Sequence, residues 1–428
     1  MNTSFNPYIL FCVIIVMALA IHVINDYWLK LQGTIAMTLG AVLVSLIIIL
    51  SNQFGLFDLS VSFKTVLQDI NFQDLLLNGM LGFLLFAGAL TVDLKSLLIF
   101  KWEVGILATF STLISTFLIG FLIYFAVHLI GLPISLLEAM LFGALISPTD
   151  PIAVLATMKA INAPKDLSIK VAGESLFNDG VGLVIFVTLL SLLIPGKSPT
   201  ISGTIFLFFR EAIGGLVYGA VLGAVSYFVI RRLSDTKLQI LMTLSVASAG
   251  YVLAQSIGIS GPLAMVVAGL ITGNIIREKA FSEHGRSELS AVWEVIEELL
   301  NAVLFLLIGL ELILLEFHFS FIIAGLIAIV IALLARLITV AVPMTYFKKQ
   351  HKKEYSPYAI TILTWGGLRG GLALAMALSL PETLPDRGLI LCMTYGVVIF
   401  SIVIQGLSAK PLVELSKKKS GAIGAIKK

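Results

Sequence analysis

The chain has 428 residues, of which 58% are hydrophobic and 12% are charged. Soluble globular proteins are about 45–50% apolar and about 25% charged, so this composition excludes a water-soluble protein and indicates a membrane protein. A chain this apolar is not intrinsically disordered, and its two cysteines, Cys12 and Cys392, are too few for a disulfide scaffold. The net charge of +3 is small, and the positions of the charges are more informative than their sum.

Apolar stretches long enough to cross a bilayer recur along the whole chain, since a transmembrane helix needs about 20 mostly apolar residues. We expect thirteen such segments, at residues 8–26, 33–51, 74–92, 103–129, 134–157, 168–194, 205–230, 238–257, 261–276, 291–315, 320–346, 357–380 and 387–408. The intervals are short and polar. The sequence therefore predicts an all-α polytopic membrane protein without a soluble domain. The first segment lacks a basic flank and a cleavage pattern, so we expect a retained helix and not a signal peptide.

Lys and Arg are distributed unevenly between the two sides that thirteen segments define. Of the 28 basic residues, 22, including Lys170, fall in alternate intervals or at segment ends on one side, and three, Lys64, Lys197 and Arg387, fall on the other side. The remaining three, Arg210, Arg336 and Arg369, lie within segments and are left out of this count. Basic residues concentrate in cytoplasmic loops. We therefore expect a multi-pass protein of the cell membrane with its N-terminus outside and its C-terminus in the cytoplasm.

A few ionisable residues fall at bilayer depth in the predicted segments, where a charge costs about 2.5–3.5 kcal/mol even on the scales that assign the smallest cost. These residues are Asp150, Glu174, Asp179, Glu311, Arg336 and Arg369. Glu311 lies near the outer end of its segment, and we interpret it as a paired structural charge. The other five lie in or beside sequences that interrupt helices, which makes them candidates for a functional site.

Two of the segments contain residues that break helices. Asp150 in the fifth segment lies between Pro148 and Pro151, and Pro removes a backbone donor and clashes with the preceding turn. Arg369 in the twelfth segment is surrounded by Gly366, Gly367, Gly370 and Gly371. Glycines also allow close helix packing in membranes, but four around one arginine favour a break. We expect both helices to be interrupted, with carbonyl oxygens freed at membrane depth.

The order of the interrupted segments predicts an internal symmetry. They are fifth and twelfth, so they cross the membrane in opposite directions. Interrupted helices at corresponding positions of two inverted halves are typical of transporter binding sites. We therefore expect two inverted six-helix repeats, segments 1–6 and 8–13, joined by the seventh segment.

The sixth segment supplies the polar groups for an ion site. On a helix, Ser175 and Asp179 share one face, and Glu174 and Asn178 share the adjoining face. Together with carbonyl oxygens from the fifth segment they form an all-oxygen cage, which suits a hard ion such as Na⁺ or Li⁺ and not a soft metal. A carboxylate in that cage also accepts a proton. Such a site holds a cation or a proton but not both, which is sufficient for exchange.

These motifs resemble those of the NhaP-type sodium/proton antiporters of the monovalent cation:proton antiporter superfamily. The resemblance covers residues 8–410 and is carried by the runs 147–151, 174–180, 305–311, 335–336 and 366–370. It implies that Asp179 carries the cation or the proton. The other ion ligands that it implies are Asp150, Ser175 and the main-chain oxygen of Thr149. The supporting network that it implies comprises Glu174 paired with Arg336, Asn178, and Arg369 beside the second break.

The resemblance also implies a division of the chain and a transport mechanism. Scaffold helices used for dimerisation comprise 1–102 and 238–319, the mobile core comprises 103–204 and 320–410, residues 205–237 connect them, and 411–428 form a short cytoplasmic tail. The core is expected to move like an elevator in a homodimer. We expect a secondary transporter and not an enzyme, with no cofactor and no nucleic-acid partner.

Asn178 bears on the stoichiometry. Relatives with two adjacent Asp tend to be electrogenic and those with Asn-Asp electroneutral, so the resemblance implies 1:1 exchange. If Asp179 crosses once with Na⁺ and once with H⁺, no net charge moves. A membrane potential, worth about 2.3 kcal/mol per charge per 100 mV, then cannot drive the cycle.

Several alternatives stay open at this point. The sequence does not choose among Na⁺, Li⁺ and K⁺, so a K⁺/H⁺ antiporter of the same fold is the main alternative, and a cation channel is a further one. It does not give the pH optimum, the direction of exchange, the dimer interface or the role of Arg369. Many relatives have an acidic residue in the third segment, where this chain has residues 86–90 without one. An intramembrane enzyme is disfavoured because HExxH and GxSxG motifs are absent.

Overall fold

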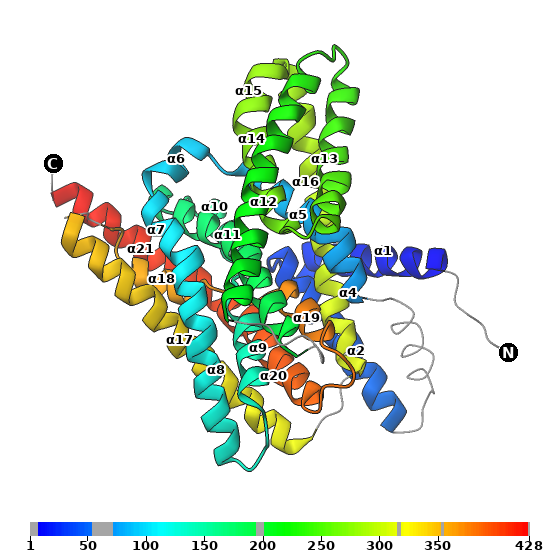
Figure 1. The fold of residues 1–428 in the computed structure, drawn as a ribbon, viewed down its shortest axis with the longest axis vertical. Helices are drawn as coiled ribbons and strands as arrows, with labels where there is room; N and C mark the ends of the chain where they lie inside the picture. Colours follow the sequence, from blue (N-terminus) through cyan, green and yellow to red (C-terminus); the bar gives the residue numbers. More distant parts are fainter. Residues whose placement is uncertain (1–6, 54–71, 194–200, 315–317, 352–354, 427–428) are drawn as a thin grey trace.

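The structure is a computed structural model that describes residues 7–53, 72–193, 201–314, 318–351 and 355–426. The regular elements of these residues are all helical, with no strand among them, as Figure 1 shows. The predicted all-α class is confirmed for this part of the chain.

The elements follow one another with few long connections. The first part comprises α1 (Pro7–Ile24), η1 (Asn25–Leu29), α2 (Gly33–Gln53), α4 (Phe72–Asp74), η2 (Leu75–Met80), α5 (Leu81–Thr91), α6 (Leu94–Ile99), α7 (Lys101–Ile106), η3 (Leu107–Ser111) and α8 (Thr112–Leu129). The middle comprises α9 (Leu136–Ile146), α10 (Ile152–Ala160), α11 (Lys165–Ser191), α12 (Ile201–Ile230), α13 (Thr236–Ser256), α14 (Gly261–Ile271), η4 (Thr272–Ile276) and α15 (Arg277–Ala280). The last part comprises α16 (Glu283–Leu310), η5 (Glu311–Leu314), α17 (Phe319–His351), α18 (Ala359–Trp365), α19 (Gly371–Leu378), α20 (Arg387–Phe400), η6 (Ser401–Gln405) and α21 (Gly406–Ile426). Here η5 is a 3₁₀ turn, and the other η elements are π-helical turns that continue neighbouring α-helices.

Nine helices of the described residues are long and apolar enough to cross a membrane. The other predicted segments correspond to α9–α10, α14–α15, α16–η5 and α18–α19. Two of these are divided into short pieces by the breaks, and α14 is short. The first half of α16 carries several acidic residues, which lowers its hydropathy. Length and composition alone therefore support fewer spans than the thirteen we expected.

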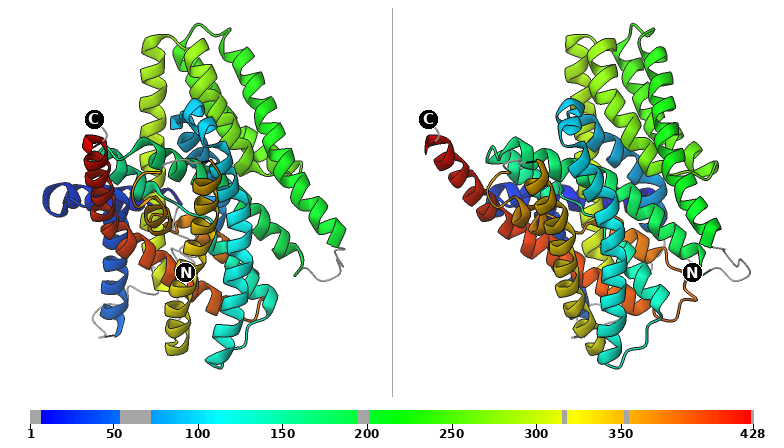
Figure 2. Two further views of the ribbon diagram at one scale, coloured as in Figure 1. Left: turned by 90° about the vertical axis from the view of Figure 1, so that its left-hand side faces the viewer. Right: turned by 60° about the vertical axis from the view of Figure 1, so that its left-hand side comes forward.

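The long helices form two groups, visible in both views of Figure 2. In one group α14 packs against α5, α12 and α13, and α16 packs against α5 and α2; in the other α8, α9, α17 and α20 pack together. Glycine allows backbone contact within each group. A Cβ at Gly143 of α9 would overlap the main chain at Thr116 of α8, and a Cβ at Gly219 of α12 would overlap the main chain at Ala264 of α14. Between the groups lies α11, which contacts α9 on one side and α12 and α14 on the other.

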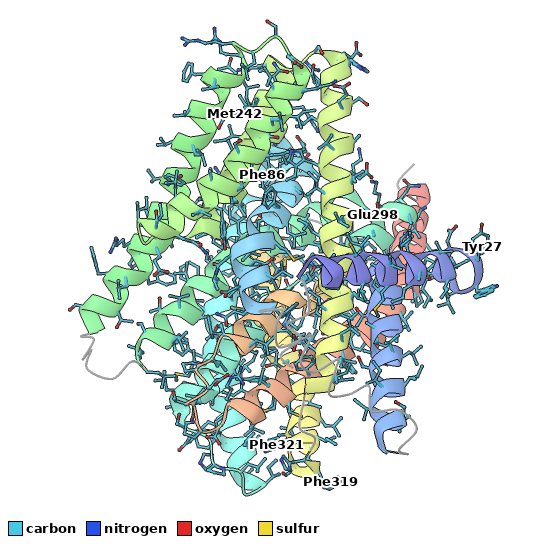
Figure 3. The ribbon with its side chains drawn as sticks, turned by 90° about the vertical axis from the view of Figure 1, so that its right-hand side faces the viewer. Tyr27, Phe86, Met242, Glu298, Phe319 and Phe321 are labelled. Atoms are coloured by element: carbon cyan, nitrogen blue, oxygen red, sulfur yellow. The ribbon has the colours of Figure 1, made fainter. Side chains whose placement is uncertain are left out.

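The first helix lies across its neighbour. In Figure 3, α1 runs across α16 rather than alongside it, and Tyr27, in the η1 turn that follows α1, is labelled at the far end. The chain turns sharply after η1, because the Asn25 side chain bonds both the N–H and the C=O of Leu31 and Lys30 adopts a left-handed conformation. The sequence pattern predicted an apolar helix here, but it did not predict this turn.

Lys170 is also placed differently from the expectation. We counted it among the basic residues of a cytoplasmic interval, but α11 begins at Lys165 and includes it. Its side chain is 0% exposed and forms an ion pair with Asp166 at 3.5 Å. Of the three basic residues assigned to the opposite side, only Arg387 lies in the described residues; Lys64 and Lys197 lie outside them.

Candidate functional site

Both predicted helix breaks are present, and they meet. Helix α9 ends at Ile146 and α10 begins at Ile152, while α18 ends at Trp365 and α19 begins at Gly371. The backbone N–H of Asp150 in the first break donates to the carbonyl oxygen of Leu368 in the second, at 2.8 Å. The two interruptions therefore form one irregular region, covered by protein as membrane-depth backbone requires.

Two of the four glycines are needed for this approach. A Cβ at Gly370 would overlap the carboxylate of Asp150, and a Cβ at Gly367 would lie 2.6 Å from Nε of Arg336. A helix break and close packing were the two interpretations of these glycines. Both apply, since the glycines lie in a break and also permit close packing there.

Thr149 in the first break is bound to α11 through three hydrogen bonds. Its carbonyl oxygen accepts from Oγ of Ser175 at 2.7 Å. Its N–H donates to Oδ1 of Asn178 at 3.2 Å, and Nδ2 of Asn178 donates to its Oγ1 at 2.8 Å. Thr149, Ser175 and Asn178 are all buried. This arrangement uses both ends of the Asn178 amide, which a carboxylate could not reproduce because it has no N–H.

The two carboxylates of the candidate site have different surroundings. Asp150 accepts from the backbone N–H of Ile152, the first residue of α10, at 3.1 Å. Asp179 has no hydrogen-bond or ion-pair partner among the described residues, and its side chain is partly exposed. The charge of Asp150 acts on Asp179. With the oxygens of Thr149 and Ser175 nearby, these carboxylates offer hard oxygen ligands. The described residues contain no group of three or more His, Cys, Asp or Glu side chains that could hold a resident metal.

Glu174 and Arg336 form a buried two-point ion pair beside this region. Nη1 of Arg336 contacts Oε1 of Glu174, and Nη2 donates to Oε2 at 3.0 Å. Nε and Nη2 of Arg336 also donate to the carbonyl oxygen of Leu363, at 3.2 and 3.0 Å. The ion pair therefore connects α11, α17 and α18, and its hydrogen bonds offset the cost of burying two charges.

Arg369 and Glu311 complete the set of predicted intramembrane charges. Arg369 lies in the second break, 2% exposed, and its Nη1 donates to the carbonyl oxygen of Gly367 at 2.9 Å. Glu311 begins η5 and is 3% exposed. We expected a paired charge there, but the described residues give Glu311 no ion-pair partner.

Two polar residues were not among the site residues that the sequence predicted. Nε2 of Gln32, just before α2, donates to the carbonyl oxygen of Ala153 in α10. Lys170 lies one turn before Glu174 on α11, between the rings of Phe100 and Tyr355. Gln32 gave no signal because its partner is 121 residues away in the chain. Asp166, Lys170 and Glu174 are spaced four residues apart, which predicts ion pairs along one face of a helix. This prediction was not made, because Lys170 was counted as a loop residue.

Comparisons with known proteins identify the family of this chain. Residues 7–415 match the family described as "Sodium/hydrogen exchanger, transmembrane". The Na⁺/H⁺ antiporter NhaP of Pseudomonas aeruginosa is 44% identical, over 91% of this chain and 92% of its own. The Na⁺/H⁺ antiporter NhaH of Halobacillus dabanensis is 34% identical, over 84% of this chain and 86% of its own.

A solved structure shares the fold. The sodium proton antiporter MjNhaP1 from Methanocaldococcus jannaschii, at pH 8, aligns with a TM-score of 0.73 and 19% identity. The alignment covers 94% of this chain and 96% of MjNhaP1. Together with the matched span of residues 7–415, these similarities show that the chain is a multi-pass membrane protein that belongs to the sodium/hydrogen exchanger family.

Proposed function

We propose that this protein is a secondary antiporter that exchanges Na⁺ or Li⁺ for H⁺ across the cell membrane, with Asp179 as the shared carrier. The observation that carries the proposal is the carboxylate of Asp179, which has no hydrogen-bond or ion-pair partner among the described residues, is acted on by the charge of Asp150, and lies on the same helix as Ser175. A carboxylate committed to a hydrogen bond or an ion pair would have to give it up before it bound a cation. The names of the relatives, all Na⁺/H⁺ antiporters, support the same substrates.

The geometry of the first break supports the ligand set that the family resemblance implies. A hard cation would be held by the carboxylates of Asp179 and Asp150, by Oγ of Ser175 and by the main-chain oxygen of Thr149. Ser175 donates its hydroxyl proton to Thr149, so its oxygen lone pairs stay free to accept the cation. The ion pair of Glu174 with Arg336 and the amide of Asn178 hold this backbone in place without taking part in binding.

Coupling arises because one carboxylate serves both ions. Asp179 crosses the membrane neutralised by a cation in one direction and by a proton in the other. Crossing with an empty, ionised Asp179 is disfavoured by the cost of moving a bare charge through the bilayer. Each cycle then exchanges one cation for one proton and is electroneutral, so the rate is independent of the membrane potential.

The two helix groups support an elevator mechanism. We assign residues 103–204 and 320–410, chiefly α7–α11 and α17–α20, to a mobile core, and residues 1–102 and 238–319, chiefly α1–α6 and α13–α16, to a scaffold that dimerises. Residues 205–237, mostly in α12, connect the two, and residues 411–428 form the cytoplasmic tail. In this assignment the thirteen segments form two inverted repeats, the N-terminus is outside and the C-terminus is cytoplasmic. The hydrogen bond from Gln32 to Ala153 would join scaffold and core in one end state only.

Transport by purified protein in liposomes tests the proposal. Asp179→Asn should abolish cation-dependent proton movement, because Asn binds neither ion at that atom. Asp235→Asn is the matched control, since Asp235 only caps the start of α13 and should keep the wild-type rate. Appreciable exchange by Asp179→Asn would refute the assignment of the carrier.

The same liposomes separate the alternatives. Assays with Na⁺, Li⁺ and K⁺ in turn distinguish a sodium from a potassium antiporter. Collapse of the membrane potential should leave the rate unchanged, and a clear dependence on potential would contradict 1:1 exchange. Single-channel currents would instead support a cation channel.

A further inference from the structure

The last helix, α21, lies against the two short helices that adjoin the breaks. It continues past residue 408, where the last predicted segment ends, and packs against both α10 and α18 (Figure 1). Val413 and Ser416 of α21 are 1% and 0% exposed. The beginning of the segment that we expected as a cytoplasmic tail is therefore packed against the rest of the chain.

One contact of α21 lies at the end of α10 that is remote from the first break. Nζ of Lys417 donates to the carbonyl oxygen of Ile161 at 2.6 Å. Ile161 follows the last residue of α10, where the final carbonyl groups of a helix have no partner within the helix. A cation at this end of a helix also interacts favourably with the helix dipole. Lys417 thus fixes the end of α10 opposite to Asp150.

The contacts with α18 lie at both of its ends. Oγ of Ser416 donates to the carbonyl oxygen of Pro357 at 2.5 Å, just before α18 begins. Between Pro357 and α18, Tyr358 has a φ of 60°, in the left-handed region that residues with a side chain rarely adopt. At the other end, Nε1 of Trp365 donates to Oγ of Ser408 at 2.8 Å. These bonds hold α18 along its length, including its strained start.

The short helices need such contacts because they have few of their own. α10 has nine residues and α18 has seven, and helices of this length have little stability in isolation. Their other ends carry the irregular backbone of the breaks, where the N–H of Asp150 donates to the carbonyl oxygen of Leu368. The position of Asp150 therefore depends on how α10 and α18 are held relative to each other, and α21 contacts both.

A loss of this support would act on cation affinity. If the remote end of α10 were released, the empty site would spend part of its time with the Asp150 carboxylate away from the binding position. The apparent dissociation constant then rises by the inverse of the fraction that is competent to bind. A bound cation would restore the arrangement by its own contacts, so the rate at saturating cation would not change.

We propose that Lys417 and Ser416 are positioning residues of the ion site, which keep α10 and α18 in the arrangement that binds the transported cation. The inference rests on the proposed cation exchange and adds α21 to the parts of the chain that determine its affinity. Neither side chain touches the ion. Each acts through the main chain of a short helix, at the end remote from the break.

Exchange by the full-length protein in liposomes, measured against Na⁺ concentration, provides the first test. Lys417→Met should raise the half-saturating Na⁺ concentration about fivefold, as expected for one lost hydrogen bond, and leave the maximal rate unchanged. Ser416→Ala should act in the same direction through α18. Lys417→Arg keeps a charged donor and should restore the wild-type value. Lys418→Met is the matched control, since it removes the same charge from the next, exposed residue of α21.

Hydrogen exchange in detergent gives a second readout that needs no transport. Without Na⁺, the amides of residues 152–160 should exchange faster in Lys417→Met than in the wild type, and saturating Na⁺ should remove the difference. A merely structural role would lower the maximal rate and leave the half-saturating concentration unchanged, and that result would overturn the inference. Equal effects of Lys417→Met and Lys418→Met would overturn it too. A wild type that exchanges no cation for protons would instead refute the proposed function.

Discussion

Nζ of Lys170 lies 4.1 Å from the centre of the Tyr355 ring and 4.5 Å from the centre of the Phe100 ring. An ammonium over an aromatic face is attracted by the ring quadrupole, more strongly when water is excluded. Lys170 also pairs with Asp166 one turn earlier on α11, and Asp166 accepts from Oγ of Ser356 at 2.7 Å. These contacts attach the start of α11 to the chain that precedes α7 and to the chain that leads into α18.

Lys170→Met should destabilise the protein by about 1–3 kcal/mol, because it removes two cation–π contacts and leaves the Asp166 carboxylate without its cation. Met keeps most of the length and apolar surface of the lysine stem, so the change isolates the charge. The measurement is the free energy of unfolding in detergent. Lys165→Met, on the same helix but exposed, is the control and should change stability little. Equal effects of the two variants would contradict a structural role for the buried ammonium.

Tyr355 should lose its phenolic proton at a higher pH than an ordinary tyrosine. Burial and the adjacent Glu103 carboxylate raise the pKa of its phenol to about 12, from an ordinary value of 10.0. The unfolded chain therefore loses this proton before the folded chain does, so stability should fall as the pH rises from about 10 to 12. The difference in phenolate absorbance between wild type and Tyr355→Phe reports this one group. A midpoint near 10 would show that Tyr355 is not in these surroundings.

Gly370→Ala should impair transport more than it impairs folding. The added Cβ would overlap the carboxylate of Asp150, so the carboxylate or the break must shift. A misplacement of about 1 Å at a reacting group can cost about 100-fold in rate, and we expect a loss of that order in exchange. At Gly388 a Cβ would meet only a ring atom of Phe321, at an ordinary 3.7 Å, so Gly388→Ala is the matched control. If the Gly370→Ala protein exchanges ions at the wild-type rate, then the position of the Asp150 carboxylate is not important for transport.

The ion pair of Glu174 with Arg336 predicts non-additive changes in stability. Glu174→Gln and Arg336→Gln should each cost about 3–5 kcal/mol, since each leaves the partner charge buried and unpaired. The double variant should cost clearly less than the sum of the two, because it leaves no lone charge. Unfolding free energies of the four proteins give the coupling directly. Additive losses would mean that the two groups do not depend on each other.

The sequence predicted the parts of this site that depend on local chemistry. Proline on either side of Asp150 and glycine around Arg369 interrupt helices for reasons that act within a few residues, and both breaks are where we expected them. The common face of Ser175 and Asp179 likewise follows from helical spacing. The roles of these residues in ion binding stay predictions.

Features that depend on distant contacts could not be predicted in this way. The burial of Lys170 depends on rings from two other parts of the chain, and the orientation of α1 depends on the turn at Asn25 and on packing against α16. A basic residue near a predicted loop and an apolar run of sufficient length are compatible with more than one tertiary arrangement. Glu311 was expected to be paired for the same reason, because its sequence position gives depth but no neighbours.

The hydrogen bond between the N–H of Asp150 and the carbonyl of Leu368 has a consequence for how these two loops can vary. A backbone hydrogen bond does not depend directly on side-chain identity, so substitutions that keep the Asp150 N–H and the close approach at Gly367 and Gly370 leave it in place. A one-residue insertion or deletion in either loop would instead shift its peptide groups out of register with the other loop. It would also displace Thr149 from Ser175 and Asn178. Among homologues, the lengths of these two loops should therefore be more constant than their sequences.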